Sequence, residues 1–370
     1  MNENSNFLSK QILTYIGNKR SLLFYIDKYI NLIKKELGKN KIVTLDLFSG
    51  SGVVSRLFKP HSSLIVANDL EDYSRVINEC FLLNKEDINE KIFNKFLNEI
   101  LFLIKTNPVE GILCKYYSPK NDDDIKKGER AFYTHKNALF IDSFRYYLDL
   151  VCVNEKYKNV FLALLVIEAS IHVNTCGVFK GFYKDNKTGI GRFGGSGEYA
   201  LNRIKGDIEI KFPFLSNFSC EYKIYQEDAT KLVMKLKDID LAYLDPPYNQ
   251  HPYGSNYFML NLIVNNVEPE NISDVSGIVK NWNRSSFNKK SEALKSLEKI
   301  ILNLNAKYIL ISYNNEGFIS FDEMVSMLNK YGAIEYEEIR YNTFRGSHNL
   351  NKRSLHTKEF LFLLKKEKRK

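Results

Sequence analysis

Short runs of apolar residues, bounded by polar residues or glycine, recur along the chain. Runs of this length are typical of strands that are buried on both faces of a parallel sheet. They occur at residues 42–48, 64–69, 222–225, 239–244 and 306–312, and two more occur at 336–344 and 359–364. Helical patterns separate most of the runs, and the last two are predicted to pair as a hairpin. The chain is therefore predicted to form a Rossmann-like α/β sheet.

The series of strands stops for a long interval in the first half of the chain. Helical patterns fill that interval at about 87–105, 130–150 and 158–172, and a Gly- and Lys-rich loop follows at 177–197. A chain of 370 residues exceeds what one hydrophobic core usually organises. We therefore expect two lobes, with residues 1–84 and 221–370 forming the sheet domain and residues 85–220 forming an inserted, mainly helical domain.

The apolar run at 239–244 is followed directly by a candidate catalytic motif, Asp245-Pro246-Pro247-Tyr248. A parallel strand delivers its last side chains to the edge of the sheet where open α/β folds bind ligands. The two prolines enforce an extended turn. A carboxylate, backbone carbonyls and an aromatic plane can together hold a planar amino-heterocycle by its exocyclic amine. The alternative is an ordinary Pro-Pro turn after a strand.

A second ligand-binding pattern follows the run at 42–48, where Ser49-Gly50-Ser51-Gly52 precedes a helical run. Glycines at such a position allow the backbone to approach a ligand. Ser55 stands where a dinucleotide fingerprint has its third glycine. Asp46 is suited to an ammonium group, and Asp69 ends the next strand and is suited to ribose hydroxyls. A nucleoside that carries a charged amino acid, S-adenosylmethionine, fits better than a nicotinamide dinucleotide.

Four separated segments resemble the Dam-like (α-group) N6-adenine DNA methyltransferases. They are Tyr15-Ile16-Gly17-Asn18-Lys19-Arg20, Asp46-Leu47-Phe48-Ser49-Gly50-Ser51-Gly52, Asn174-Thr175-Cys176-Gly177-Val178-Phe179 with Gly191-Arg192-Phe193-Gly194, and Asp245-Pro246-Pro247-Tyr248. The stretch from Asn249 to Tyr257 is more similar to modification enzymes of the FokI type than to housekeeping Dam. The resemblance runs from Tyr15 to about Leu364. It implies a methyltransferase sheet whose insertion carries target recognition.

The activity that this resemblance implies is methyl transfer from S-adenosylmethionine to the N6 amine of a flipped-out adenine in duplex DNA. Asp245 and the Pro246 carbonyl would hold the amine, and Tyr248 would stack on the base. Catalysis would then rest mostly on positioning and electrostatics. The predicted catalytic residues are Asp245, Pro246, Pro247 and Tyr248, and the predicted cofactor-binding residues are Tyr15, Lys19, Asp46, Phe48, Gly50, Gly52, Asp69, Asp228 and Asp245.

Each cofactor contact has an expected partner. Tyr15 and Lys19 would meet the methionine carboxylate and Asp46 its ammonium group, while Asp69 would bind the ribose and Asp228 the adenine amino group. The alternative for Asp46 and Asp69 is helix N-capping. Tyr15 could equally be a core aromatic.

The candidate DNA-binding residues come from two basic segments. Asn174, Lys180, Lys184 and Arg192 belong to the N-x-x-G-x-F stretch and the glycine-rich loop, where basic and aromatic side chains suit phosphate contact and base stacking. Arg345 and Arg353 lie in the connection between the last two strand runs. The alternatives are an ordinary surface loop and a charged turn.

Composition agrees with these expectations without deciding them. The net charge of +9, from 53 basic and 44 acidic residues, is compatible with double-stranded DNA as partner. Scattered cysteines argue against zinc and disulfides, so no metal is expected. No apolar stretch is long enough to span a bilayer. We expect a cytoplasmic monomer, with a separately acting restriction endonuclease as a possible partner.

Rival functions remain at the level of sequence. The same tetrapeptide serves the exocyclic amine of cytosine, and an adenine in RNA is another acceptor. A methyltransferase fold that has lost its chemistry would serve as a DNA-binding module, but the retained tetrapeptide and glycines disfavour it. The order of the motifs, with the insertion between cofactor loop and tetrapeptide, favours adenine in DNA by resemblance.

Overall fold

The computed structural model describes residues 2–195, 198–342 and 356–367. Its centre is a seven-stranded sheet with the order β3-β2-β1-β4-β5-β7-β6. The strands are β1 (Ile42–Asp46), β2 (Ser62–Asn68), β3 (Glu221–Tyr225), β4 (Ile239–Leu244), β5 (Ala306–Asn314), β6 (Gly332–Asn342) and β7 (His356–Lys366). Strands β1 to β5 are parallel, and β7 is antiparallel to both β5 and β6. The predicted Rossmann-like sheet with its terminal pair is confirmed.

Register at the centre of the sheet brings the acidic strand ends together. Leu45 of β1 lies opposite Val66 of β2 and Ala242 of β4. Every residue of β4 is buried, as expected of a central parallel strand covered on both faces. Because the strands run parallel, Asp46, Asp69 and Asp245 emerge at the same carboxyl edge.

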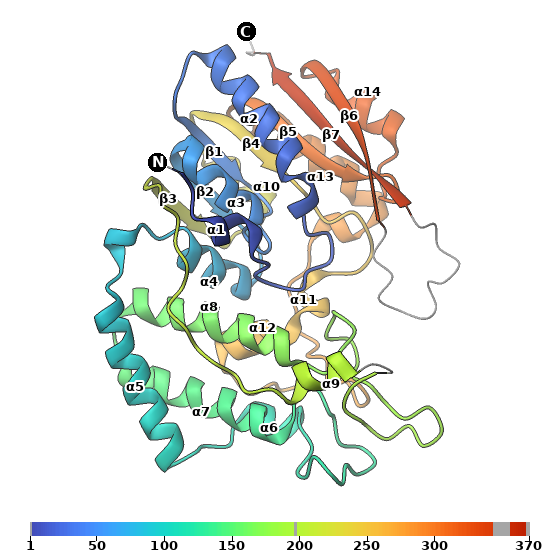
Figure 1. Ribbon diagram of the computed structural model, residues 1–370. Helices are drawn as coiled ribbons and strands as arrows, with labels where there is room; N and C mark the ends of the chain where they lie inside the picture. The colour runs from blue at the N-terminus through green and yellow to red at the C-terminus, as the bar shows by residue number, and fades with distance from the viewer. Residues whose placement is uncertain (1, 196–197, 343–355, 368–370) are drawn as a thin grey trace.

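Helices cover both faces of the sheet (Figure 1). One face packs against α2 (Leu23–Leu37) and α3 (Val53–Phe58), and the other packs against α10 (Ala229–Leu232), α13 (Lys290–Asn303) and α14 (Phe321–Leu328). Helix α2 ends at Gly38, whose φ of 63° is left-handed and costs glycine little. Helices α2, α13 and α14 each bury one apolar stripe against the strands, whereas every residue of α3 is buried.

A second, helical layer lies below the sheet in the view of Figure 1. It comprises α4 (Asp72–Phe81), α5 (Glu90–Thr106), α6 (Ile112–Tyr116), α7 (His135–Val151), α8 (Glu155–His172), α9 (Glu198–Lys205), α11 (Tyr253–Asn256) and α12 (Phe258–Asn265). Short elements complete the described chain: α1 (Ser5–Ser9), η1 (Arg20–Leu22), η2 (Lys59–His61), η3 (Lys85–Asp87) and η4 (Ser286–Asn288). Helix α12 follows β4 in sequence, yet it shares one hydrophobic core with α5, α7 and α8. The helical layer therefore draws on residues outside 85–220.

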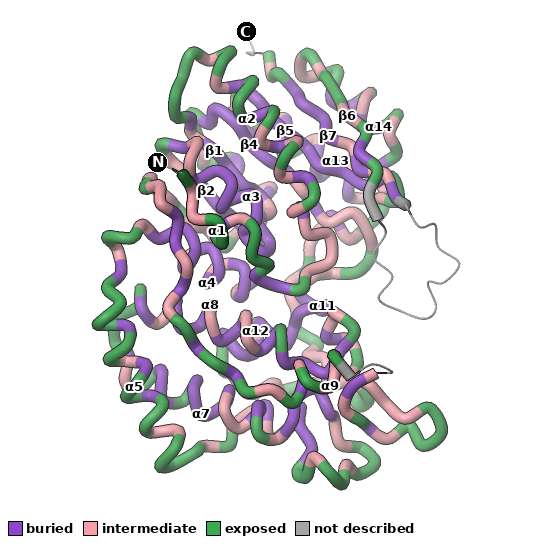
Figure 2. The backbone as a smooth tube through the Cα atoms, viewed as in Figure 1, coloured by how far each residue is buried: buried purple, intermediate pink, exposed green. Residues whose placement is uncertain are grey.

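Capping residues determine where the predicted helices begin. The helix expected at 130–150 starts only at His135, because Thr134 has an extended backbone and its side chain accepts from Asn137 N as an N-cap. Asn89 and Asn154 cap α5 and α8 in the same way. Figure 2 shows buried residues along the central strands and exposed ones along the outer side of α5. No helix in the part of the chain that the structure describes has the length and apolarity to cross a membrane.

Candidate active site

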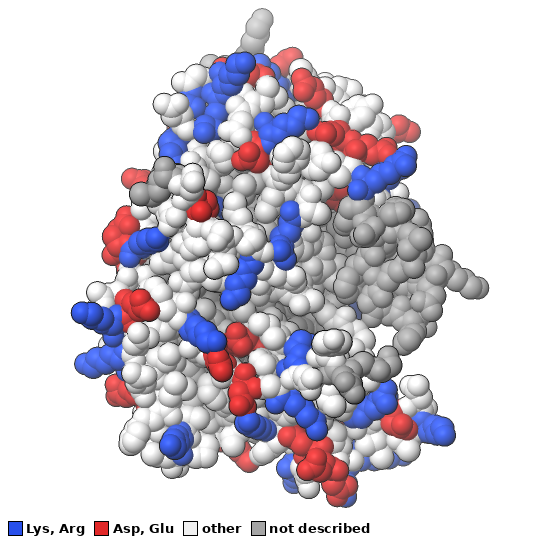
Figure 3. Space-filling view, in the orientation of Figure 1, with Lys and Arg blue, Asp and Glu red and all other residues white. Residues whose placement is uncertain are grey.

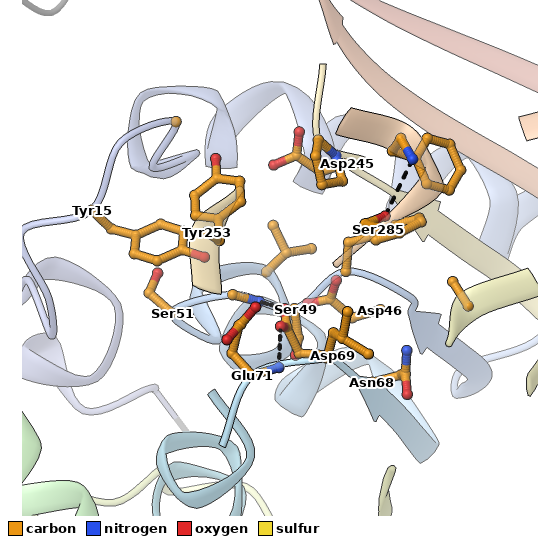
Figure 4. Close-up of a pocket in the computed structure, with 18 of the residues that line it drawn as sticks. Tyr15, Asp46, Ser49, Ser51, Asn68, Asp69, Glu71, Asp245, Tyr253 and Ser285 are labelled. Carbon is orange, nitrogen blue, oxygen red and sulfur yellow. Dashed lines mark hydrogen bonds between the residues drawn. The ribbon is translucent and has the colours of Figure 1, made fainter. Parts of the chain in front are cut away.

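One pocket opens at the carboxyl edge of the sheet, where the strand-end acids meet (Figure 4). Its lining comes from the N-terminal segment, the β1–α3 loop, the ends of β2, β3 and β4, and the segment before α13. The sequence-predicted residues that line it are Tyr15, Lys19, Asp46, Phe48, Gly50, Asp69, Asp228, Asp245 and Pro247. The fold therefore gathers most of the predicted cofactor residues in one place.

Gly50 brings the backbone of the β1–α3 loop against the pocket. Its φ is 52°, and its N–H donates to Asp69 Oδ2 over 2.7 Å. A Cβ atom at this position would stand 3.1 Å from the ring of Tyr15. The left-handed conformation and the close aromatic ring together require glycine here.

Gly52 has a different role from the one predicted. It does not line the pocket, and a Cβ atom there would lie 2.9 Å from Asn78 Oδ1 rather than in ligand space. Its φ of 71° places it as the N-cap of α3. The missing side chain of Gly52 accommodates Asn78, and a contact of Gly52 with the cofactor stays a prediction.

The acids of the pocket are buried, and burial raises their pKa values. The pKa of Asp46 rises to about 7, chiefly through desolvation, although Ser55 Oγ donates to Asp46 Oδ2 over 2.6 Å. Burial also raises the pKa of Asp69, against the backbone N–H groups of Gly50 and Glu71 that donate to it. The pKa of Glu71 rises to about 8, again mainly by burial. The capping alternative fits Asp46 in part, because the backbone N–H of Ser55, in the first turn of α3, also bonds to it. Asp69 instead accepts from Gly50 N and Glu71 N, which lie outside the helices.

Asp228 and Phe48 lie on the sheet side of the pocket. Asp228 Oδ1 accepts from Thr230 N over 2.9 Å and so caps α10. Phe48 packs edge-to-face on Phe287, with ring centroids 5.3 Å apart. An aromatic wall beside a capped helix start suits a flat heterocycle.

Tyr15 combines the two roles that the sequence left open. Its ring stacks on Tyr253 and Tyr257, with centroids 5.0 and 4.9 Å apart, and its hydroxyl lies 3.2 Å from that of Tyr73. It is thus packed in an aromatic cluster, yet it also lines the pocket. Figure 4 shows Tyr15 and Tyr253 side by side on one wall, across from Asp46 and Asp69.

Asp245 meets a buried ammonium group. Lys19 Nζ lies 3.0 Å from Asp245 Oδ1 and donates to Glu359 Oε1 over 2.8 Å. Burial raises the pKa of Asp245 to about 7, Lys19 opposes that rise and Glu359 adds to it. Lys19 was expected to reach the cofactor's carboxylate, but in this structure its charge is shared by two protein carboxylates.

The rest of the tetrapeptide is held in place by neighbouring loops. Phe318 N donates to the Tyr248 carbonyl over 3.0 Å, and the Tyr248 ring packs edge-to-face on Tyr313. Among the described residues, no hydrogen bond reaches the Pro246 carbonyl or Asp245 Oδ2. Two acceptors of the tetrapeptide are therefore available to a ligand.

Asn174 is placed differently from the prediction. It is fully buried, and its amide donates to the carbonyls of Ala131 and Arg192 and accepts from Gly194 N. With its polar atoms satisfied inside the protein, Asn174 is not positioned to touch DNA. It instead fastens the glycine-rich loop to the helical layer.

The other candidate DNA contacts lie on that loop. Lys184 pairs with Gly191 as a small hairpin, and its ammonium sits 4.8 Å from the Phe182 ring centroid. Arg192 is exposed and Lys180 is half-buried, which lowers the pKa of Lys180. Basic and acidic side chains are interspersed over the face shown in Figure 3. Arg345 and Arg353 lie outside the described residues.

Several pocket residues carry no local sequence signal. The segment before α13 contributes Asn283, Ser285 and Phe287 to the lining. Asn283 Nδ2 donates to Glu71 Oε2 and to the Leu70 carbonyl. Glu359 could have been noticed as an acid that opens an apolar strand run.

The charge of the pocket favours a cationic ligand. Asp46, Asp69, Glu71 and Asp245 line it together with Lys19, which is already shared by two carboxylates. A phosphate-bearing ligand would meet like charge, whereas an ammonium or sulfonium would compensate the buried acids. Within the described ranges, no cluster of His, Cys, Asp and Glu could hold a metal ion.

Comparison with known proteins agrees with this chemistry. A family model described as D12 class N6 adenine-specific DNA methyltransferase matches residues 15–327. The chain is similar to the Type II methyltransferase M.NlaIII of Neisseria lactamica, with 28% identity over 364 residues that cover 96% of this chain and 99% of that protein. It is 30% identical over 337 residues to the Type II methyltransferase M.CviAII of Paramecium bursaria Chlorella virus 1, covering 90% and 92% of the two chains.

A FokI-type relative is also similar, as the sequence motifs suggested. The Type II methyltransferase M.FokI of Planomicrobium okeanokoites is 26% identical over 363 residues, which cover 96% of this chain and 53% of that protein. This chain thus corresponds to about half of that longer relative.

Asp46 should make the ligand-free protein less stable as the pH rises. Its pKa of about 7 lies above its ordinary value, so its ionisation is penalised in the folded state and stability is lost as the pH rises through 7. D46N removes that penalty. We compare the unfolding free energy of D46N with that of the wild type at each pH. The difference, D46N minus wild type, should be about 2 kcal/mol larger at pH 8 than at pH 5.5.

Urea unfolding at the two pH values measures this difference. E99Q, which changes an exposed acid on α5 in the same way, supplies the baseline. An equal effect of D46N at both pH values would contradict the account of Asp46.

Proposed function

The chain belongs to the D12 class of N6 adenine-specific DNA methyltransferases, and from this premise we propose which methyl donor it uses and which residues carry the reaction. It is an adenine-specific DNA methyltransferase. The observation that carries the proposal is a pair of acceptors beside an acid-lined pocket, Asp245 Oδ2 and the Pro246 carbonyl, to which no donor among the described residues bonds.

S-adenosylmethionine is the proposed methyl donor. Its ammonium and sulfonium charges suit a pocket of buried carboxylates, and its adenine suits the wall of Phe48 and Phe287. Asp46 would hold the ammonium group, Asp69 or Glu71 the ribose hydroxyls, and Asp228 the adenine amino group. When bound, this donor supplies an electrophilic methyl group on a positively charged sulfur.

The target amine would be held by the tetrapeptide. The lone pair of an adenine N6 amine is delocalised into the ring, which makes the amine a weak nucleophile. Hydrogen bonds from its two N–H groups to Asp245 Oδ2 and the Pro246 carbonyl would favour a pyramidal nitrogen with greater electron density. This arrangement is preorganised, so most of the rate enhancement comes from position and electrostatics.

The amine of a paired adenine is hidden inside the duplex, so the base must leave the stack to reach Asp245. Tyr248, next to the acceptors, is proposed to stack on the flipped base. The protein's part is to hold the extruded ring, to exclude water around the amine, and to accept its hydrogen bonds.

The helical layer, centred on residues 85–220, is proposed to recognise the target sequence. Its glycine-rich loop contacts α11, which follows the tetrapeptide in the chain, because Phe179 N donates to the Asn256 carbonyl over 2.8 Å. Lys180 also lies close enough to His251 to add to the lowering of its pKa, which burial dominates. Basic side chains on this loop would therefore meet phosphates near the flipped base.

A role in restriction–modification is proposed from the relatives. M.NlaIII, M.CviAII and M.FokI are named as Type II methyltransferases. By analogy, this chain would protect its recognition sites against a restriction endonuclease that acts as a separate protein.

Replacement of the acceptor acid tests the catalytic assignment. D245N should reduce methyl transfer by at least about 10³-fold, because the amine loses an anionic acceptor. Binding of S-adenosylmethionine should change by less than about tenfold, since the proposed donor contacts lie mainly on other residues. Calorimetry and a methyl-transfer assay measure the two effects. Substantial residual transfer would remove Asp245 from this role.

Neutralisation of the loop tests the recognition assignment. The triple variant K180Q/K184Q/R192Q should bind DNA more weakly, and the slope of log affinity against log salt should fall by about 0.9 for each lost phosphate contact. K35Q/K295Q/K299Q removes the same number of charges from the exposed sides of α2 and α13 and should leave the slope unchanged. Donor affinity without DNA should be the same in both. An unaltered slope in the loop variant would place phosphate contact elsewhere.

A further inference from the structure

Glu359 is a buried acid on the antiparallel strand β7, far from the motif residues in sequence. Its side chain is fully buried. Oε1 accepts from Ser312 Oγ over 2.5 Å and from Lys19 Nζ over 2.8 Å, and Oε2 accepts from Asn314 Nδ2 over 3.2 Å. Two donors from β5 therefore hold this carboxylate in one orientation, facing Lys19.

Lys19 connects Glu359 to the catalytic acid. Its side chain is only 4% exposed, and Nζ lies 3.0 Å from Asp245 Oδ1. Asp245 Oδ1 is thus committed to the ammonium, while Oδ2 makes no hydrogen bond within the described ranges. The chain of contacts Ser312–Glu359–Lys19–Asp245 selects which oxygen of Asp245 faces the pocket.

We propose that Glu359 is a positioning residue for methyl transfer: it holds the Lys19 ammonium against Asp245 Oδ1, so that Asp245 Oδ2 is presented to the target amine with most of its negative charge retained. This inference rests on the proposed function of Asp245. Glu359 touches neither substrate nor donor in this scheme and acts through Lys19.

Charge balance explains why a second acid is needed. If Lys19 faced Asp245 alone, the pair would be neutral and the ammonium would draw electron density from the oxygen that must polarise the amine. Glu359 divides the attraction of Lys19 between two carboxylates, and the buried trio keeps a net negative charge. A second buried charge is expensive for stability unless it is well bonded, and Ser312 and Asn314 supply that bonding to Glu359.

Other titratable groups face Asp245 and must be considered in any pH measurement. They are Lys19 and Tyr243 on either side of it, Tyr248 and Tyr253 across the tetrapeptide, Asp46 at the end of β1, and Glu359 behind Lys19. Tyr243 and Tyr253 have pKa values raised by burial and stay neutral below pH 9. The protonation state of Asp46 is kept the same across the profile by saturating the protein with the methyl donor at every pH.

The test is the pH profile of single-turnover methyl transfer in E359Q. Transfer requires ionised Asp245, so the wild-type rate should rise with pH through an acidic limb. Removal of the Glu359 charge takes away an effect that raises the pKa of Asp245. The limb should therefore move to lower pH, by about 0.5–1 unit, and the plateau rate should fall on the order of tenfold.

Two further variants fix the interpretation. K19Q removes the ammonium and should move the acidic limb in the opposite direction, to higher pH. E359D keeps the negative charge but is one methylene too short for the 2.8 Å contact with Lys19. Its limb should lie between those of the wild type and E359Q, and it replaces E359Q in the test if E359Q does not fold, as judged by circular dichroism.

A uniform loss of rate with an unmoved limb in folded E359Q, or in E359D if it stands in, would overturn the inference and leave Glu359 a structural residue. D245N, measured in parallel, separates this outcome from failure of the proposed function. If D245N abolishes transfer while the acidic limb of the Glu359 variant coincides with that of the wild type, only the inference about Glu359 fails. If D245N remains active, the catalytic assignment fails first.

Discussion

Burial of several carboxylates at one edge of a parallel sheet is the constraint on which the rest of the site depends. Strands β1, β2 and β4 end side by side, so the acids that terminate or follow them cannot be separated. Asp46 and Asp245 have pKa values of about 7 as a result of burial. Such a cluster is unfavourable in the ligand-free protein and becomes favourable once a cationic ligand enters. The buried acids therefore lower the stability of the ligand-free protein and increase the affinity of the pocket for cations.

The segment between β4 and β5 links this pocket to the helical layer. Near its middle, Arg130 donates to the carbonyls of Ser273 and Asp274, and Tyr117 donates to that of Gly277. At its far end, Asn283 donates to Glu71 in the pocket. The same stretch of chain therefore contacts the layer proposed to recognise DNA and the pocket proposed to hold the methyl donor.

Sequence reasoning succeeded where the signal was local. Strand ends predicted the acidic edge, because the direction of parallel strands decides where Asp46, Asp69 and Asp245 emerge. It could not anticipate contacts that depend on packing between distant segments. Gly52 is required by Asn78, and Asn174 is a buried anchor, neither of which a motif reveals. Glu359 was invisible as a partner of Lys19 because 340 positions separate them.

Proton release on binding S-adenosylmethionine tests the central claim, that a cationic donor compensates the buried acids. At pH 6.5 the donor's amino group is already protonated, whereas acids with pKa values of about 7 or 8 are mostly neutral in the free protein. Calorimetry in buffers of different ionisation enthalpy should show net proton release, because a bound cation lowers those pKa values, and affinity should increase between pH 6 and pH 8. Binding without proton release, or with an affinity that does not depend on pH, would contradict the account.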